Sequence, residues 1–215
     1  PMKRLALFVC VLTFYFFAAG AAVHAADRKK PRPAVSWGEC GRQEAAWYKT
    51  PEAMRIADNV LFYQAGIGGW YKNDSSIHPS GNAATELLSA AERKRHKESL
   101  LKRKYPCTLD NDATHSELRY LAKVYAATGR GKYKVGFLRG VEYLLKAQYP
   151  SGGWAQFYPP RPGYSSRITF NDGAMIGAIG VLADVAKRRP PYGLADGVLL
   201  ERWRGGVGEG SACSL

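Results

Sequence analysis

The sequence has few cysteines, and they lack the spacing of a metal site. Four cysteines occur in 215 residues, and no Cys-x-x-Cys pair or Cys/His cluster indicates structural zinc. Cys40 and Cys107 are candidates for a disulfide, but the sequence does not give the distance between them. Their pairing therefore stays open at this level, and a zinc-stabilised fold is not indicated.

Acidic residues are scarce relative to basic ones. The chain has 31 Lys and Arg against 18 Asp and Glu, a formal charge of +13 and a pI near 9.7. This balance favours a polyanionic partner, which would be nucleic acid, an anionic membrane surface or an acidic polysaccharide. The alternative is a basic surface that contacts only water.

The N-terminus narrows these choices. Lys3 and Arg4 precede an apolar run over residues 5–22, and Val23-His24-Ala25 supplies the small residues of a cleavage site. This pattern predicts a secretory signal peptide over residues 1–25; a membrane anchor is the alternative. Residues 26–36 form a charged leader. We therefore expect a secreted protein, extracellular or periplasmic, with no nucleic-acid partner and no stable membrane association after cleavage.

No long strand is apparent, and helical periodicity dominates instead. Thr50 and Pro51 have the residue types of an N-cap and a first helical position. Residues 83–103 are so basic that we expect a solvent-exposed excursion between core helices. The sequence predicts one all-α domain over residues 37–191, with helices over 51–64, 83–103, 117–128, 133–148 and 172–187.

An internal repeat organises these helices. Residues 55–70 match residues 139–154, which aligns Gln64 with Gln148 and Trp70 with Trp154; residues 110–124 match residues 171–185. Helical hairpins that recur with long loops indicate an α/α solenoid or toroid, since one hairpin cannot bury its apolar face alone. Two hairpins are fewer than a toroid needs, so we expect an incomplete one. Residues 192–215 break the pattern and read as an atypical tail.

Acidic residues and amides mark two helix starts, Asp110-Asn111-Asp112 and Asn171-Asp172. Helix capping is one explanation for each. Because equivalent helix starts converge in a toroid, a shared Ca²⁺ site is the other explanation, and neither segment is an EF-hand. His115 is expected in a polar cleft or as a cap. Thr114 and Glu117 are read as surface or capping residues.

Several motifs resemble the family 10 polysaccharide lyases, which are pectate lyases. They are Trp70-Tyr71-Lys72-Asn73, Thr108–Thr114, the stretch QYPSGGWAQFY over residues 148–158, and Ile168-Thr169-Phe170-Asn171-Asp172. Tyr71 replaces a family proline, and Arg167 replaces a frequent histidine. The resemblance implies an α/α toroid that cleaves polygalacturonate by β-elimination, with Ca²⁺ bridging the enzyme and a substrate carboxylate.

The resemblance also implies roles for individual residues. Asp110 and Asp172 would be calcium ligands, with Asn111 as a helper. The family's catalytic base is an arginine that lies further along than this chain reaches, so no catalytic residue is assigned here. We expect a monomer whose substrate-binding residues are Lys72, Trp154, Tyr158, Arg161 and Arg167. For Trp70 and Trp154, the alternative is that they lock their loops onto the core. For Arg161 and Arg167, the alternative is that they are solvent-exposed charges on a loop with no part in binding.

Two other functions stay open at the sequence level. Gln64-x₃-Gly68-x-Trp70 and its repeat also fit the Q-x₃-G-x-W motif of triterpene cyclases, although Asp110-Asn111-Asp112-Ala113 lacks the final Asp of their acidic motif. A non-catalytic fragment that binds acidic polysaccharide is the third hypothesis.

Overall fold

The computed structural model describes residues 35–71, 83–102 and 106–194. The chain divides into two compact units, Pro1–Arg32 and Pro33–Leu215, and every described residue belongs to the second unit. The predicted signal peptide, most of the leader and Lys72 lie outside the described residues. So does nearly all of the atypical tail.

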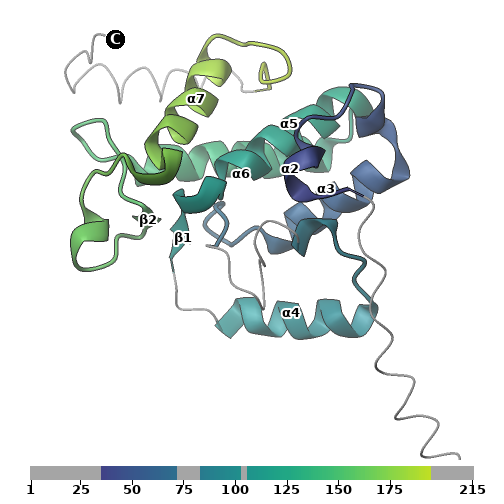
Figure 1. Ribbon diagram of the computed structural model, residues 1–215, viewed down its shortest axis with the longest axis horizontal. Helices are drawn as coiled ribbons and strands as arrows, with labels where there is room; N and C mark the ends of the chain where they lie inside the picture. Colours follow the sequence, from purple (N-terminus) through teal and green to yellow (C-terminus); the bar gives the residue numbers. More distant parts are fainter. Residues whose placement is uncertain (1–34, 72–82, 103–105, 195–215) are drawn as a thin grey trace, which may run out of the picture. The chain divides into compact units, whose positions relative to one another are not determined.

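The described part of the chain is mostly helical (Figure 1). Short 3₁₀ turns and one small two-stranded sheet connect the helices. None of the described helices is both long and apolar enough to cross a membrane. The helices are α2 (Trp37–Cys40), α3 (Pro51–Tyr63), α4 (Ala90–Lys102), α5 (His115–Thr128), α6 (Gly131–Ala147) and α7 (Ala174–Ala186). The 3₁₀ turns are η2 (Trp47–Lys49), η3 (Ala83–Thr85), η4 (Asp110–Asp112), η5 (Tyr164–Ser166) and η6 (Asn171–Gly173), and the strands are β1 (Cys107–Thr108) and β2 (Phe157–Tyr158).

Local signals place most helix ends where the sequence predicts them. The Thr50 hydroxyl accepts a hydrogen bond from the Ala53 N–H at 3.2 Å, and Pro51 occupies the first turn of α3. Gly129 ends α5 with φ of 67°, a left-handed conformation that suits glycine. The expected helix over residues 83–103 begins only at Ala90, and the expected helix at residue 172 begins at Ala174, after the turn η6.

The core lies between α3, α5 and α6, with α7 packed on α5. α5 and α6 are joined by two residues, so they form a helical hairpin. Gly136 and Gly140 allow close approach to α6: a Cβ added there would lie 2.2 Å from Leu61 Cδ2 and 2.4 Å from Leu118 Cδ2. A larger residue at either position would therefore require Leu61 or Leu118 to shift.

Cys40 and Cys107 are both buried, and no disulfide joins them. The disulfide left open by the sequence is absent from the structure. Burial raises the pKa of the Cys40 thiol to about 12. This cysteine therefore behaves as a small core residue rather than as a nucleophile.

Candidate functional site

The two Gly-Gly-Trp loops have the same hydrogen-bond pattern. In the first loop, Gln64 Nε2 donates to the Gly68 carbonyl at 2.7 Å and Trp70 Nε1 donates to the Val60 carbonyl at 2.9 Å. In the second, Gln148 donates to Gly152 at 2.8 Å and Trp154 donates to Leu144 at 2.8 Å. Gly68 and Gly152 share a positive φ, of 100° and 92°. The repeat predicted from the sequence is thus repeated in three dimensions.

Both tryptophans are buried, with 1% of Trp70 and 3% of Trp154 exposed. Each indole fastens its loop to the end of the preceding helix, α3 or α6. The structure therefore supports the loop-locking alternative for Trp154, and its ring face is not accessible to a sugar.

Three chain segments meet beside the loops. Strand β1 pairs antiparallel with β2, and Tyr71 forms an isolated bridge with Cys107. Thr114 connects them: its hydroxyl donates to the Thr108 carbonyl at 2.8 Å and accepts from the Trp70 N–H at 3.1 Å. Thr114 is completely buried and Glu117 is 1% exposed, so neither is a surface residue. Thr114 occupies the N-cap position of α5, as the capping alternative expected.

The two acidic turns have the same backbone. Leu109 before η4 has φ −103° and ψ −5°, and Phe170 before η6 has φ −103° and ψ 8°. Asp112 and Gly173 then share a positive φ, of 60° and 68°. In each turn a threonine two residues earlier caps the first N–H: Asp110 N lies 3.0 Å from Thr108 Oγ1, and Asn171 N lies 3.3 Å from Thr169 Oγ1.

These turns lie in contact with one another, and α7 contacts both. Asp110 is buried, with 2% exposed, whereas the Asp112 side chain is 76% exposed. Asn111 is exposed and has a positive φ of 53°. Asp172 belongs to η6, but its side chain is outside the described part. The fold therefore brings the backbones of the predicted calcium-ligand positions together, and within the described residues no three His, Cys, Asp or Glu side chains form a metal cluster.

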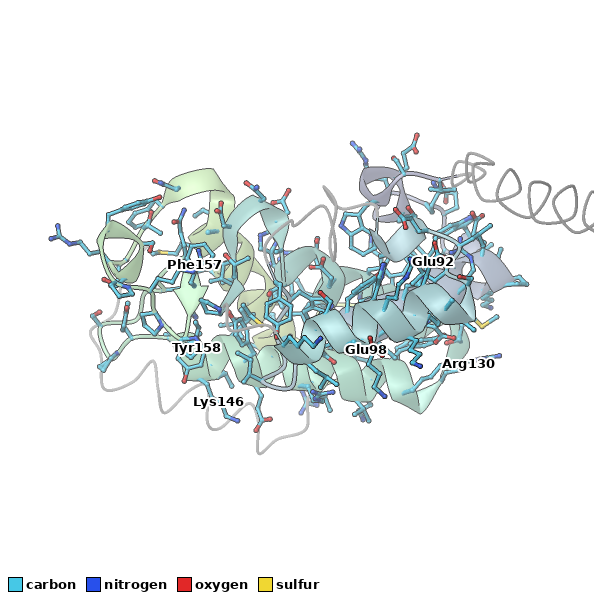
Figure 2. All side chains as sticks on the ribbon, turned by 90° about the horizontal axis from the view of Figure 1, so that it is seen from below. Glu92, Glu98, Arg130, Lys146, Phe157 and Tyr158 are labelled. Atoms are coloured by element: carbon cyan, nitrogen blue, oxygen red, sulfur yellow. The ribbon has the colours of Figure 1, made fainter. Side chains whose placement is uncertain are left out.

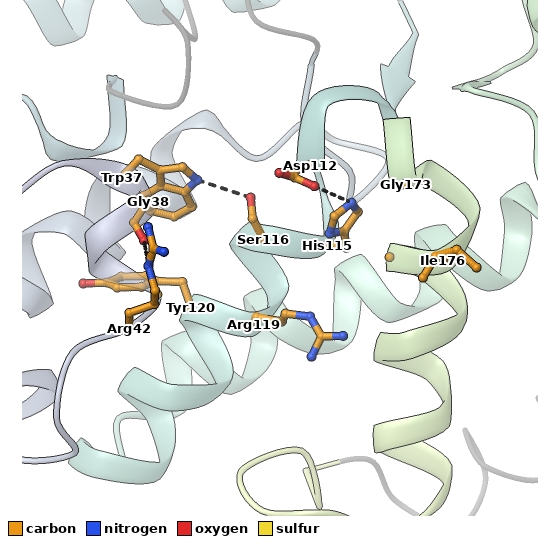
Figure 3. Close-up of a pocket in the computed structure, with 12 residues that line it drawn as sticks. Trp37, Gly38, Arg42, Asp112, His115, Ser116, Arg119, Tyr120, Gly173 and Ile176 are labelled. Carbon is orange, nitrogen blue, oxygen red and sulfur yellow. Dashed lines mark hydrogen bonds and ion pairs between the residues drawn. The ribbon is translucent and has the colours of Figure 1, made fainter. Parts of the chain in front are cut away.

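A pocket of about 590 Å³ opens beside the turns (Figure 3). The α2 segment, the start of α5 and the start of α7 form its walls. Trp37 Nε1 donates to Ser116 Oγ at 3.3 Å, which ties α2 to α5. Arg42, Asp112 and Arg119 supply its charged side chains, and His115 supplies an imidazole.

The pocket contains one fixed cation and one buried imidazole. Arg119 Nη1 contacts Asp184 Oδ2 at 3.1 Å and the Tyr192 hydroxyl at 3.2 Å. Burial lowers the pKa of Arg119, but these partners outweigh it and the pKa is raised. Burial lowers the pKa of His115, whose Nε2 lies 3.6 Å from Asp112 Oδ1. A Cβ at Gly177 would lie 2.3 Å from that nitrogen, so the ring fits only against a glycine.

The remaining predicted residues lie on the loop between α6 and η6. Tyr158 is half-buried in β2, with its ring 5.8 Å from that of Tyr143. The Arg161 guanidinium lies 3.9 Å from the centroid of the Phe157 ring, and Arg167 is exposed. The sequence analysis missed the pocket residues Trp37, Arg42 and Arg119. A Ser36-x-x-Glu39 pattern, typical of a helix start, was the available signal for α2: Glu39 accepts from both the N–H and the hydroxyl of Ser36.

Comparison with known proteins assigns the family. The family model for pectic acid lyase matches residues 64–215, which includes the tail that the sequence analysis set apart. A family 10 polysaccharide lyase from Cellvibrio cellulosa has a similar structure, with 31% identity and a TM-score of 0.59 over 76% of this chain and 45% of that one. A mutant of the Cellvibrio cellulosa lyase in complex with trigalacturonic acid gives 30% identity and a TM-score of 0.58 over 79% and 49%. No curated protein sequence matches this chain.

The chain therefore belongs to the pectic acid lyase family, and its fold class is the α/α toroid, as the sequence predicted. It spans about half the length of the solved structures that it matches. Family membership overturns the triterpene-cyclase alternative. The Gln and Trp of that motif here hold the repeated loops closed.

Proposed function

We propose that this chain forms part of a secreted pectate lyase that cleaves polygalacturonate by calcium-assisted β-elimination. The observation that carries the proposal is the contact between η4 and η6. Two turns with carboxylate and amide residues lie together beside a pocket with cationic side chains. The solved relative in complex with trigalacturonic acid supports an acidic sugar as the ligand.

The residues at the turns fit calcium. Asp110, Asn111 and Asp172 offer oxygen donors only, and Ca²⁺ takes several oxygen ligands. A metal ion is one of the partners that can stabilise a carboxylate as buried as that of Asp110. When bound, calcium would neutralise a substrate carboxylate and acidify the proton at C5 of the sugar.

The cationic side chains are proposed to bind the carboxylates of the substrate. Arg119 is held as a cation by Asp184 and Tyr192, so it suits a uronate carboxylate and is a poor proton acceptor. Arg42, Arg161 and Arg167 are further candidates for charge-assisted hydrogen bonds to uronates. The base that removes the C5 proton is not assigned to a described residue.

The test is an assay of new unsaturated uronide ends by ultraviolet absorbance. Purified chain is incubated with polygalacturonate, with calcium or with chelator. The proposal expects a rise in absorbance that needs calcium and is lost in Asp172→Ala. The exposed Glu44→Gln variant, which leaves the turns intact, serves as the matched control.

A non-catalytic role in binding acidic polysaccharide is the second candidate. The fixed charge of Arg119 favours it, because the raised pKa of this pocket arginine makes it a poor proton acceptor. Folded protein that binds polygalacturonate with calcium but yields no absorbance would select this role and reject the lyase for this chain.

A further inference from the structure

Helix α4 presents an exposed basic surface that the proposed site does not use. Its outward side chains are Lys94, Arg95, Lys97, Glu98, Leu101 and Lys102, which we call the α4 basic surface. No residue of α4 is buried, and Leu101 is 78% exposed. Figure 2 views the chain from the side on which α4 lies in front, with its two acidic residues, Glu92 and Glu98, labelled.

The opposite face of α4 is held firmly to the domain. Arg93 donates to Asn59 Oδ1 at 2.6 Å and lies 5.2 Å from the centroid of the Phe62 ring. His96 Nδ1 and the Tyr63 hydroxyl are 2.7 Å apart. The basic surface is therefore fixed outward by polar contacts to α3.

The start of the helix is also specified. Ser89 and Glu92 form a capping box: Glu92 Oε2 accepts from the Ser89 N–H at 2.8 Å, and the Glu92 N–H donates to Ser89 Oγ at 3.3 Å. A helix that is polar all round gains little from packing. Repulsion between neighbouring lysines opposes it further, so core burial does not explain this basic helix.

The basic surface leads toward the candidate site. α4 is about 20 Å long at 1.5 Å per residue. It ends at Lys102, and β1 begins at Cys107; a five-residue step spans at most about 18 Å. β1 pairs with β2, which carries Tyr158, and Asp110 follows two residues after β1. A polymer bound on the surface can therefore extend to the turns.

The geometry points to the α4 basic surface as a second docking site for polygalacturonate, separate from the calcium-dependent site and independent of calcium. The inference rests on the substrate class of the proposed function. A regular array of uronate carboxylates complements Lys94, Lys97 and Lys102, and electrostatic attraction of this kind concentrates a polyanion at the surface. Leu101 supplies an apolar contact between the charges.

Affinity electrophoresis tests this inference directly. The full chain is run in gels that contain polygalacturonate and chelator, so neither calcium nor turnover contributes. The test variant is Lys94→Glu/Lys97→Glu/Lys102→Glu. The matched control, Lys49→Glu/Arg130→Glu/Lys187→Glu, makes the same change in charge at exposed positions elsewhere. Circular dichroism checks that both variants fold.

We expect the wild type and the control to be retarded, with an apparent Kd for the test variant raised about tenfold or more. Added salt should release the wild type, because exposed charges are screened. Equal retardation of the test variant and the control would overturn the inference. So would retardation by a neutral galactan, or tighter binding to double-stranded DNA at equal charge. A chain without lyase activity would still be retarded, so failure of the proposed function is distinguishable from failure of this inference.

Discussion

The two repeat units of this chain share a backbone but differ in what surrounds it. Asp112 and Gly173 occupy equivalent left-handed positions. His115 of the first unit is 7% exposed and covered by α7, whereas its counterpart Ile176 is 64% exposed. α7 therefore covers the first helix start, whereas the side of α7 that carries Ile176 is exposed among the described residues. The comparison teaches that loop geometry comes from local sequence, whereas burial comes from position in the array.

The two acidic turns also differ in which residues have a left-handed backbone. A left-handed residue other than glycine is strained, and such strain gathers at functional sites. The first unit keeps Asn111 and Asp112 in this conformation, and the second uses Gly173 at the matching place. The strain lies next to the pocket, which agrees with a functional role for η4.

The largest expected effect on the two loops comes from removing the tryptophan of each. Trp70→Ala and Trp154→Ala should each lower the free energy of unfolding by about 3–5 kcal/mol, because both indoles are buried and hydrogen-bonded. Urea unfolding measures the two effects. If Trp154→Ala kept full stability but lost polygalacturonate binding, Trp154 would be a sugar platform and the loops would not be equivalent.

The two loop glutamines should differ. Gln64 Nε2 donates to both Gly68 and Gly136, at 2.7 and 2.8 Å, whereas the Gln148 side chain donates to Gly152. Gln64→Ala should therefore cost about 2 kcal/mol and Gln148→Ala about 1 kcal/mol. Equal losses in urea unfolding would show that the bond between Gln64 and α6 contributes nothing.

The turn glycine of the second unit gives a smaller effect. Gly173→Ala should cost about 1–2 kcal/mol, because a Cβ at φ of 68° is strained although nothing lies within 4 Å of it. Gly131→Ala is the control, since that glycine is equally open and its φ is not positive. A thermal melt that did not separate these variants would reject backbone strain as the reason for glycine in η6.

The smallest expected effect is the change of folding stability with pH that His115 causes at the start of α5. Burial lowers the pKa of His115 from its usual 6.5. The unfolded chain therefore takes up the proton first as pH falls, and His115 stabilises the fold above pH 6.5 but loses this contribution below it. Urea unfolding at several pH values should show that His115→Gln reduces the loss of stability on acidification. If His115→Gln lost as much stability on acidification as the wild type, the lowered pKa of His115 would not be the cause of that loss.

Much of this architecture could be predicted because its signals are local. Pro51, Gly129 and the repeated Gly-Gly-Trp loops fix helix ends and loop geometry through backbone conformation. The pocket could not be predicted, because Trp37, Arg42 and Arg119 are brought together only by packing of α2 on α5. For Trp154 the sequence left loop locking and sugar binding open for a related reason: an aromatic beside a Gly-Gly turn has the same sequence pattern whether its ring faces the core or solvent.

The most direct test of the account is whether calcium binds at the two turns together. A thermal melt of the wild type should shift upward in calcium relative to chelator, by the equivalent of about 2.7 kcal/mol when calcium exceeds its Kd a hundredfold. Asp110→Asn and Asp172→Asn should each abolish the shift, and Glu44→Gln should keep it. A shift that persists in both aspartate variants, or no shift in the wild type, would contradict a calcium site shared by η4 and η6.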